Sequence, residues 1–537
     1  MAEQSDLIII GSGINGLVAG ALCARAGKKV QLFERNPQLG GAIKTEEATL
    51  PGFTHELLSS WHPLFLGGPA YGQLKDELEK RGLHYKNTSA PTGVICQAGS
   101  GILFTDPDLH RAEMERLGDS KNWDSFIEDF GGKIDLAFGV LGTDFWRPSV
   151  ITFARTVQKR LGRRGSLTAI SESLEPATSW LDRQFKSEVT KSLLAPWALH
   201  NGIGPDDAAS AFITKVISLA ISFGGMPIPV GGGVKLVDAL AGIIRDNGGE
   251  IFTNVDISKI LTEGSGRKKK VTGVRSTSGE EFSSPVVLAS TTPHALYQGL
   301  LAGEEKPKDV ATSVASFRYG RAAIQIHLAL DGKPEWGSDR RLNDVAIVHI
   351  LDGVNSLSQS VNAANRGYLP SRPTIVVGQP CVLDPSRAPE GKSILWIQLQ
   401  ENPQEIQGDL AGEIDPGDGS WSSEVLERYS ERVIDQIAIQ IPNLRSLIKA
   451  KLVLGPREIE ALNINLVGGD PYSGDCRIDQ YALWRPLSAA TGHKTFIRGL
   501  WHIGASTHPG PGLGGGSGYL VAQRLLKRSL FEKLFWR

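Results

Sequence analysis

Residues 6–16 read DLIIIGSGING, and residues 30–34 read VQLFE. The apolar run predicts a parallel strand buried on both faces, and the glycines after it predict a tight turn into a helix over about residues 13–26. Glu34 closes a second strand, where a carboxylate can accept hydrogen bonds from ribose hydroxyls. Strand, glycines, helix and acid follow in this order. They favour a bound dinucleotide over a purely structural glycine turn.

The whole chain has the composition of a globular protein with a large core. It has 537 residues, of which 41% are hydrophobic and 21% charged. The formal net charge of −1 argues against nucleic acid as a partner, because nucleic-acid-binding proteins usually carry a basic surplus. The four cysteines form no closely spaced pair, so a zinc ribbon or redox dithiol is not expected. No other metal-ligand spacing stands out, and we expect no metal.

We expect a cytoplasmic protein, with attachment to a membrane surface as the alternative. The first strand begins at residue 6, which leaves no room for a signal peptide. No apolar run reaches the roughly 18 residues of a spanning helix. The basic stretch 155–164 and the amphipathic stretch 526–537 could contact an anionic membrane surface. A solvated helix face is the more usual explanation of such patterns.

Two glycine-rich segments favour FAD over NAD. Gly40 and Gly41 follow the ribose acid closely, where a chain that passes beneath a second large ring system has no room for a Cβ atom. Near the C-terminus, an apolar strand over 499–506 leads into a glycine-dense loop over 507–518 and then a helix. Backbone N–H groups at such a helix start would stabilise a negatively charged reduced flavin. The alternative for this loop is a flexible surface segment.

Residues 249–255 and 285–290 read as further strands with a hairpin-like stretch between them. They resemble the returning half of a glutathione-reductase-type FAD domain, which implies that the backbone of Val255 contacts adenine. A core valine explains this position equally well. The residues expected to contact the cofactor are Gly11, Gly13, Ile14, Asn15, Gly16, Glu34, Arg35, Gly40, Gly41, Ala42, Val255, Gly504, Ala505, Gly512, Leu513 and Gly514.

Other motifs are PGFTHE at 51–56, GGGVKLVDAL at 231–240, DPSRAPEGK at 384–392, NLVGGD at 465–470 and ASTHPG at 505–510. With the N-terminal fingerprint, they make the chain resemble the phytoene-desaturase-like FAD oxidoreductases. Within this family it is similar to the branch called pyridine nucleotide-disulfide oxidoreductase domain-containing protein 2. The resemblance covers both ends and much of the last 300 residues. It is weakest over about 105–225, where substrate choice is expected to lie.

The resemblance implies an α/β fold, with a glutathione-reductase-type Rossmann FAD domain, a mixed-sheet substrate domain and a helical lid insertion. We expect residues 1–105, 226–300 and 486–537 to form the FAD-binding domain. Residues 301–485 are expected to form the substrate-binding sheet domain. The lid is assigned to 106–225, because apolar residues recur there at three- and four-residue spacings.

Two features depart from what the family and its name suggest. The family commonly has consecutive glycines after His-Pro, whereas this chain has Gly510-Pro511-Gly512, and the proline removes a backbone donor. The branch name suggests a disulfide reductase, but there is no redox cysteine pair and no second nucleotide fingerprint. The Gly231 triplet reads instead as a turn that opens a helix.

His508 is the leading candidate for a catalytic base or substrate-positioning group, because it lies in the loop expected to face the flavin. His55 is the second candidate, and His62 is a further residue that could line the pocket. Backbone-bonded or core histidines are the alternatives at these positions. His200 beside Trp197 reads more readily as a core residue, and Tyr472 as either a pocket or a turn residue.

An FAD without a dithiol or a nicotinamide domain points to oxidation of C–H or C–N bonds. We expect dehydrogenation, or desaturation, of a mainly apolar or cyclic small molecule by hydride transfer to flavin N5. Electrons would then pass to oxygen, a quinone or another acceptor. A flavin-dependent double-bond isomerase, an amine oxidase and an FAD-retaining interaction protein remain alternatives. The sequence leaves the substrate, the acceptor and the oligomeric state open.

Overall fold

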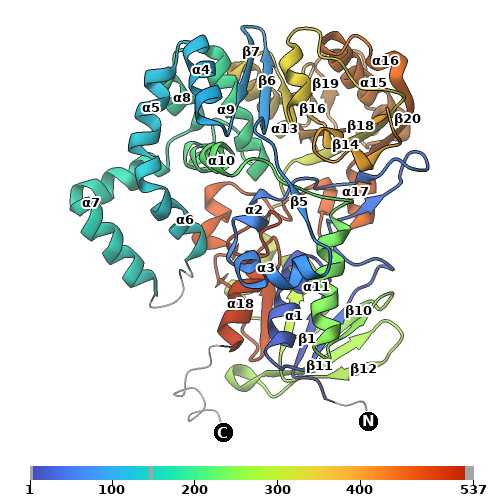
Figure 1. The fold of residues 1–537 in the computed structure, drawn as a ribbon. Helices are drawn as coiled ribbons and strands as arrows, with labels where there is room; N and C mark the ends of the chain where they lie inside the picture. The colour runs from blue at the N-terminus through green and yellow to red at the C-terminus, as the bar shows by residue number, and fades with distance from the viewer. Residues whose placement is uncertain (1–3, 144, 146–148, 527–537) are drawn as a thin grey trace.

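A five-stranded parallel sheet holds the N-terminal glycine loop in the computed structural model, which describes residues 4–143, 145 and 149–526 (Figure 1). Its strands, in spatial order, are β23 (Leu500–Ile503), β13 (Val287–Ser290), β1 (Leu7–Ile10), β2 (Val30–Phe33) and β9 (Glu250–Phe252). All four neighbouring pairs are parallel. Strands from both ends and the middle of the chain therefore build one sheet, and β1 is fully buried as the sequence predicts.

Three helices cover one face of this sheet, namely α1 (Ile14–Arg25), α11 (Val234–Asp246) and α18 (Gly516–Leu526). A three-stranded antiparallel sheet lies on the other side, built from β10 (Ile257–Glu263), β11 (Lys270–Ser276) and β12 (Glu281–Ser283). Its Ile260, Val274 and Phe282 share a core with Ile8 and Phe33. The predicted strand–glycine–helix–strand unit is confirmed to within two residues at each end.

A seven-stranded mixed sheet forms the upper part of the molecule in Figure 1. Its strands, in spatial order, are β20 (Ile448–Leu454), β14 (Ala322–Leu330), β18 (Ser393–Asn402), β17 (Ile375–Gly378), β15 (Ile347–Ile350), β6 (Thr92–Cys96) and β7 (Gly99–Leu103). Helix α15 (Ser423–Gln440) shares a core with one face of this sheet. Strand β6 pairs in parallel with β15, so β6 and β7 lie in this sheet although they precede residue 105.

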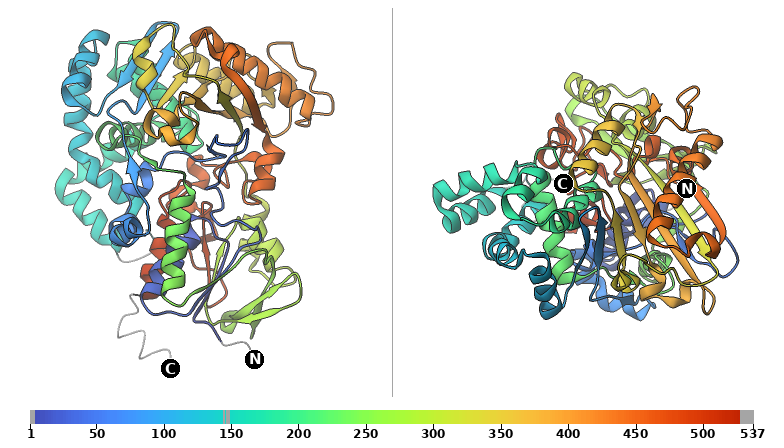
Figure 2. Two further views of the ribbon diagram at one scale, coloured as in Figure 1. Left: turned by 45° about the vertical axis from the view of Figure 1, so that its right-hand side comes forward. Right: turned by 90° about the horizontal axis from the view of Figure 1, so that it is seen from above.

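The region between β7 and residue 225 is helical, as its periodicity predicts. It contains α4 (Pro107–Leu117), α5 (Ser120–Asp129), α6 (Ile134–Gly142), α7 (Ser149–Ser173), α8 (Ala177–Gln184), α9 (Glu188–Leu194) and α10 (Ser210–Gly224). Helices α8, α9 and α10 share a core with the inner strands of the seven-stranded sheet. Helix α7 extends away from the body of the molecule in Figure 1 and in the right view of Figure 2.

The Gly231 triplet forms a turn between the short strand β8 (Ile228–Pro229) and helix α11. Gly231 and Gly232 have φ values of 76° and 118°, a backbone region that favours glycine. The turn follows a two-residue strand that pairs with β5 (Tyr85–Lys86), outside the parallel sheet. This confirms that the triplet is not a second nucleotide fingerprint.

Candidate functional site

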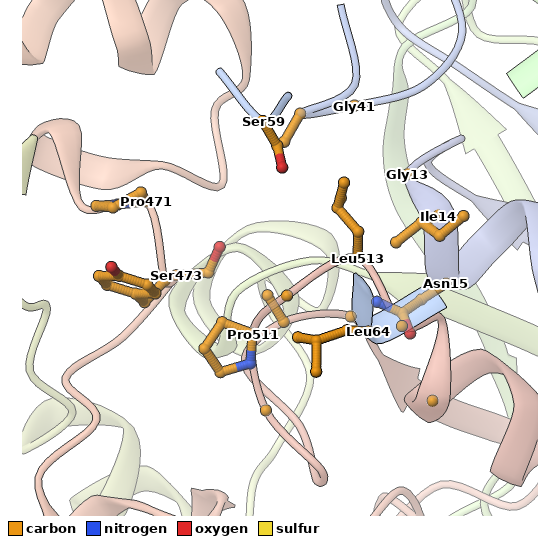
Figure 3. A pocket seen from close by; sticks show the side chains of 18 of the residues that line it. Gly13, Ile14, Asn15, Gly41, Ser59, Leu64, Pro471, Ser473, Pro511 and Leu513 are labelled. Carbon is orange, nitrogen blue, oxygen red and sulfur yellow. The ribbon is translucent and has the colours of Figure 1, made fainter. Parts of the chain in front are cut away.

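A cavity of about 1380 Å³ lies between the parallel sheet and the seven-stranded sheet. Figure 3 shows Gly13, Ile14 and Asn15 on one side of it, the C-terminal loop residues Pro511 and Leu513 beside them, and Ser59 and Ser473 around the same space. The volume exceeds the roughly 300–1,000 Å³ of a common small-molecule site. The cavity therefore has room for a dinucleotide together with a second molecule.

Every residue predicted to contact the cofactor lines this cavity except Gly16. Gly16 acts through packing instead, because a Cβ atom there would lie 2.2 Å from the carbonyl oxygen of Gly11. Gly11 itself has a φ of 93° and approaches Ser290, whose carbonyl oxygen would lie 3.2 Å from a Cβ atom on Gly11. The first glycine thus allows the turn, and the third brings helix α1 close to strand β1.

The Glu34 carboxylate fixes the glycine loop to the end of strand β2. Its Oε2 accepts hydrogen bonds from the backbone N of Ser12 at 3.0 Å and from Ser12 Oγ at 2.6 Å. Its Oε1 accepts from the backbone N of Asn36 at 2.9 Å. Glu34 lines the cavity, so ribose binding stays its predicted role, and it orients the loop as well.

Replacing Glu34 by glutamine is expected to weaken FAD binding about tenfold or more. An amide offers one acceptor oxygen, and its NH₂ group would face the N–H of Ser12 or of Asn36. Hydrogen bonds to charged groups contribute about 1.5–3 kcal/mol, and about 1.4 kcal/mol corresponds to a factor of ten. Fluorescence titration of the apoprotein with FAD measures the affinity. The control is E250Q, on the neighbouring strand β9, and equal affinities of the two variants would contradict the prediction.

Backbone crowding requires the two glycines after Glu34, and their contact with a second ring system stays a prediction. A Cβ atom on Gly41 would lie 2.9 Å from the Cα atom of Gly13, and one on Gly40 would lie 2.5 Å from the carbonyl oxygen of Ile43. Gly40 also forms a parallel bridge with Gly13. The crowding therefore comes from the chain's own backbone, at the place where two cofactor loops touch.

Val255 and the C-terminal loop close the site from two distant parts of the chain. The backbone N of Val255 donates to the carbonyl oxygen of Glu34 at 3.0 Å, so a backbone contact with adenine would fall to the carbonyl group of Val255. The backbone N of Gly518 donates to Asn15 Oδ1 at 3.1 Å. A Cβ atom on Gly518 would lie 1.9 Å from the carbonyl oxygen of Asn15, so this glycine lets helix α18 reach helix α1.

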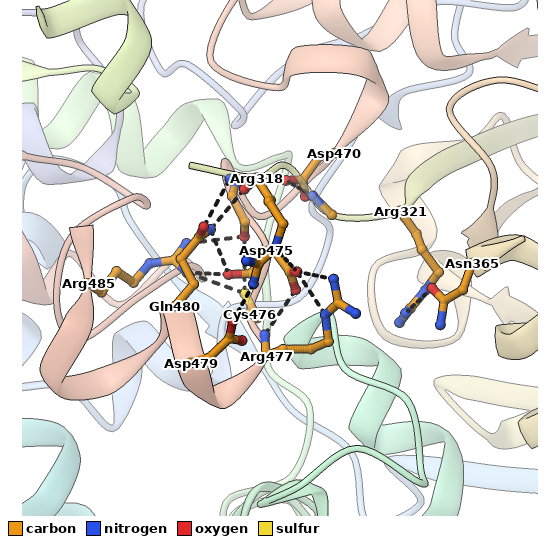
Figure 4. Close-up of polar contacts among 12 residues, drawn as sticks. Arg318, Arg321, Asn365, Asp470, Asp475, Cys476, Arg477, Asp479, Gln480 and Arg485 are labelled. Carbon is orange, nitrogen blue, oxygen red and sulfur yellow. Dashed lines mark hydrogen bonds and ion pairs between the residues drawn. The ribbon is translucent and has the colours of Figure 1, made fainter. Parts of the chain in front are cut away.

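A buried arginine, Arg485, holds the segment 470–485 against the end of strand β23. Figure 4 shows Arg485 beside Asp475 and Gln480 of this segment. Arg485 is fully buried, and its Nε donates to the carbonyl oxygen of Ala505 at 3.0 Å. Its Nη2 donates to the carbonyl oxygen of Tyr472 at 2.9 Å. Asp470 accepts from the backbone N of Gly474 at 2.7 Å and from that of Gly320 at 2.8 Å. This network positions Tyr472 and Ser473 on the cavity wall.

Comparison with known proteins places these features in context. Residues 9–78 match the model of the NAD(P)-binding Rossmann-like domain. The chain is 27% identical to pyridine nucleotide-disulfide oxidoreductase domain-containing protein 2 of Rattus norvegicus, over 96% of this chain and 92% of the relative. It is 24% identical to a neurosporene-forming phytoene desaturase of Rhodobacter capsulatus, over 96% and 93% of the two chains.

Among solved structures, cyclohexylamine oxidase from Brevibacterium oxydans superposes with a TM-score of 0.57 at 14% identity. The superposition covers 97% of this chain and 100% of that chain, and at this identity it supports the fold. The fold, the glycine loops and the similarity to desaturases along nearly the whole chain agree. The chain is an FAD-dependent oxidoreductase.

The residues present fit FAD. The glycine positions leave the backbone open toward the cavity at the start of α1 and at Gly504, whose φ is 112°. Two hydroxyl groups on the cavity wall, Thr291 Oγ1 and Ser60 Oγ, are buried without a hydrogen-bond partner in the part of the chain that the structure describes. Phosphate, ribose or ring atoms of the cofactor could satisfy such groups.

The structure places neither predicted catalytic histidine on the cavity wall within its described residues. His508 is buried, and its ring contacts Phe145 with a centroid distance of 5.0 Å. His55 is buried against His327, and its Nε2 lies 2.8 Å from Thr49 Oγ1. Burial and the nearby His327 and Arg387 lower the pKa of His55 to about 3. Their catalytic roles stay predictions, and this geometry does not favour them.

His200 lies on the cavity wall, although the sequence favours a core position. Its Nε2 is 3.0 Å from Nε2 of His349, so one ring must donate a hydrogen to the other. Burial lowers the pKa of His200 to about 3, so the ring stays neutral near pH 7. His62 is instead fully buried, with Nδ1 3.0 Å from Tyr85 Oη.

Asn465 also lines the cavity, and the sequence predicts no role for it. Its Nδ2 donates to the carbonyl oxygen of Ser290 at 3.2 Å, and its Oδ1 accepts from the backbone N of Thr292 at 3.0 Å. It thus fixes the end of strand β13 beside the cofactor loops. The signal was present, because Asn465 opens the NLVGGD motif that supports the family resemblance.

The four cysteines are free thiols, and Cys23, Cys96 and Cys476 are buried. Burial raises the pKa of Cys23 and of Cys476 to about 12 and that of Cys381 to about 11. The reactive thiolate is therefore scarce near neutral pH. This agrees with the sequence argument against a disulfide reductase.

We expect fewer than one thiol per chain to react quickly with an aromatic disulfide reagent at pH 8. All four should react after unfolding in guanidinium chloride, because unfolding returns each thiol to an ordinary pKa. Absorbance of the released thiolate counts the reacted groups. Rapid reaction of two thiols in the folded protein would contradict the structure.

Proposed function

We propose that this oxidoreductase dehydrogenates a neutral, mainly apolar small molecule by hydride transfer to flavin N5. Oxygen, a quinone or another acceptor would then take the electrons. The observation that carries the proposal is the distribution of charge in the cavity. Its charged lining residues, within the described chain, are Glu34, Arg35 and Asp256. All three lie near the ends of strands β2 and β9, beside the predicted ribose site, so the rest of the cavity favours an uncharged substrate.

The remaining wall is suited to hold such a molecule and to exclude water. Helix α10 contributes Ile213, Val216, Ile217 and Ala220, which recur at helical spacing and line the cavity. Trp197 and Trp396 contribute two large rings. Bound FAD would supply the hydride acceptor. The protein's part is to hold a substrate carbon in a fixed orientation in a dry site, where positioning contributes strongly to rate.

Anaerobic titration of the purified yellow protein with candidate substrates tests the proposal. Loss of the visible flavin absorbance on addition of a substrate supports dehydrogenation. Turnover only after prior reduction of the flavin would favour the isomerase. If no ligand produces a redox response, the remaining alternative is a protein that keeps FAD without turnover and acts by binding a partner.

Amine oxidation is the nearest alternative, because an amine oxidase shares the fold. Ammonium substrates are stabilised by nearby carboxylates. The carboxylates that line the cavity in the described chain lie near the predicted ribose site, away from the apolar wall of α10. This distribution favours a neutral substrate. If amines bleach the flavin and neutral apolar molecules do not, amine oxidation becomes the better-supported function.

We further propose that helix α7 contacts an anionic membrane surface, from which an apolar substrate could enter. The helix is kinked at Gly162, where the backbone is not helical. Its exposed apolar side chains are Ile151 before the kink and Leu167 and Ile170 after it, and the basic stretch 155–164 spans the kink. Arg160 is already paired with Asp135.

The second predicted stretch, 526–537, falls almost wholly outside the described residues. No described helix is long and apolar enough to cross a membrane. Sedimentation with phosphatidylserine vesicles, compared with phosphatidylcholine vesicles, tests this contact.

A further inference from the structure

Three glutamines form a polar patch on the wall of an otherwise largely apolar chamber. Gln325 on β14 lies directly opposite Gln398 on the antiparallel strand β18, and Gln400 is two residues further along β18. All three line the cavity, with exposed fractions of 1%, 9% and 5%. Side chains two residues apart on a strand share a face, so the three amides are neighbours.

The position of this patch is set by the period-two alternation of the strands. The opposite face of β14 and β18 carries Ile324, Ile326, Ile397 and Leu399, which pack in the core beneath α15. The cavity face could have been equally apolar, as it is at Ala323 and Trp396. Instead it buries three amides. An amide buried without a partner costs about 1–3 kcal/mol.

The amides of this patch have unused hydrogen-bonding capacity. Oε1 of Gln325 and Oε1 of Gln400 are buried and have no hydrogen-bond partner within the described chain. Nε2 of Gln400 donates to Tyr472 Oη at 3.0 Å, and Tyr472 Oη donates to the carbonyl oxygen of Leu199 at 2.6 Å. Gln400 is thus held in place by the wall. Both unpaired oxygens are almost without accessible surface, so each amide must rotate slightly for its oxygen to meet a ligand. A plain hydrocarbon would leave these groups unsatisfied.

We propose that the substrate carries one hydroxyl group, which binds to Gln325, Gln398 and Gln400, while its apolar body packs against helix α10. This inference rests on the proposed function, because it takes the chamber to be the substrate site. The unpaired atoms are amide oxygens, which only accept, so the ligand must donate an O–H group, and a carbonyl group has none to donate. Neither a carboxylate nor an ammonium group finds a charged partner there, since the charged lining residues lie near the predicted ribose site.

Isothermal titration calorimetry of the FAD-loaded protein with nonane, 2-nonanol and nonanoate tests the inference. The three probes share a similar chain length and differ in the polar group. We expect 2-nonanol to bind about tenfold more tightly than either of the others, because its O–H group can donate to an amide oxygen, and one satisfied hydrogen bond contributes about 0.5–1.5 kcal/mol and removes a burial cost. Equal binding of nonane and 2-nonanol, tighter binding of nonane, or binding of none of the probes would overturn the inference.

The double variant Q325L/Q398L should lower the affinity for 2-nonanol to that for nonane and leave nonane binding unchanged or tighter. The control is Q436L on α15, which lies outside the cavity lining and should bind all probes as the unaltered protein does. Should the double variant not fold, Q325L and Q398L are measured singly, and each should lose about threefold in affinity for 2-nonanol. Calorimetry measures binding without turnover. Its failure would contradict the hydrogen-bonding inference, whereas a failure of flavin bleaching would contradict the proposed dehydrogenation.

Discussion

The variant G16A is expected to purify without the yellow colour of bound flavin. A Cβ atom at position 16 would lie 2.2 Å from the carbonyl oxygen of Gly11 and 3.3 Å from Ile9 Cγ2. The nearer atom belongs to backbone and cannot rotate away. Helix α1 would have to move off strand β1, which displaces the loop 11–15 that lines the cavity. Overpacking of this kind costs about 1–3 kcal/mol.

The ratio of absorbance near 450 nm to that at 280 nm measures the flavin content, and thermal unfolding measures the stability. The matched control is G72A. Gly72 also lies within a helix, α3 (Pro69–Lys80), and a Cβ atom there meets nothing within 4 Å. Alanine at an open helical site stabilises by up to about 1 kcal/mol. A G16A variant that retains flavin and melts together with G72A would refute the packing argument.

The dinucleotide half of the site could be predicted from the sequence because its signals are local. The strand, the glycines and the acid lie within 30 residues, and steric rules fix what such a run can form. Even there, the sequence does not indicate one of the reasons for Gly41. Its neighbour is Gly13, a contact that depends on how two loops pack and that no local pattern contains.

The substrate half could not be predicted in the same way. Strands β14 and β18 read as core strands on both faces, and their sequences do not say which face borders a cavity. Likewise, β6 and β15 pair although some 250 residues separate them, so strands placed before residue 105 join the second sheet. The roles of Gln325, Gln400 and His200 depend on pairings of this kind and become visible only in three dimensions.

Three sequence motifs that support the family resemblance meet in one buried ion network. Arg387 of DPSRAPEGK is 1% exposed, and its Nη1 lies 2.9 Å from Oε1 of Glu56 in PGFTHE. Its Nε lies 2.8 Å from Asp384 Oδ2, and its Nη2 donates to the carbonyl oxygen of Pro229 at 2.7 Å. The acids extend the network to the glycine triplet, since Glu56 accepts from the backbone N of Gly233 at 2.7 Å and Asp384 from that of Gly231 at 2.8 Å.

The variant R387M is therefore expected to lose about 3–5 kcal/mol of stability. Methionine fills much of the same space but leaves two carboxylates buried without their cation. Burial already raises the pKa of Glu56 against the lowering effect of Arg387. Without the arginine, this pKa should rise further, and Glu56 should take up a proton on folding. The loss should then grow as the pH rises through that pKa, because the charged form is the one that burial disfavours.

Urea unfolding at several pH values measures these losses, with R445M as the matched control. Arg445 pairs with Glu431 and Asp435 but is 40% exposed, so its removal should cost at most about 1 kcal/mol. Neutralising both acids in R387M/E56Q/D384N should restore part of the stability, since it removes the buried charges that the single variant leaves unpaired. If R387M and R445M lose the same stability, the buried network stabilises the fold no more than an exposed ion pair does, and its three motifs must serve another purpose.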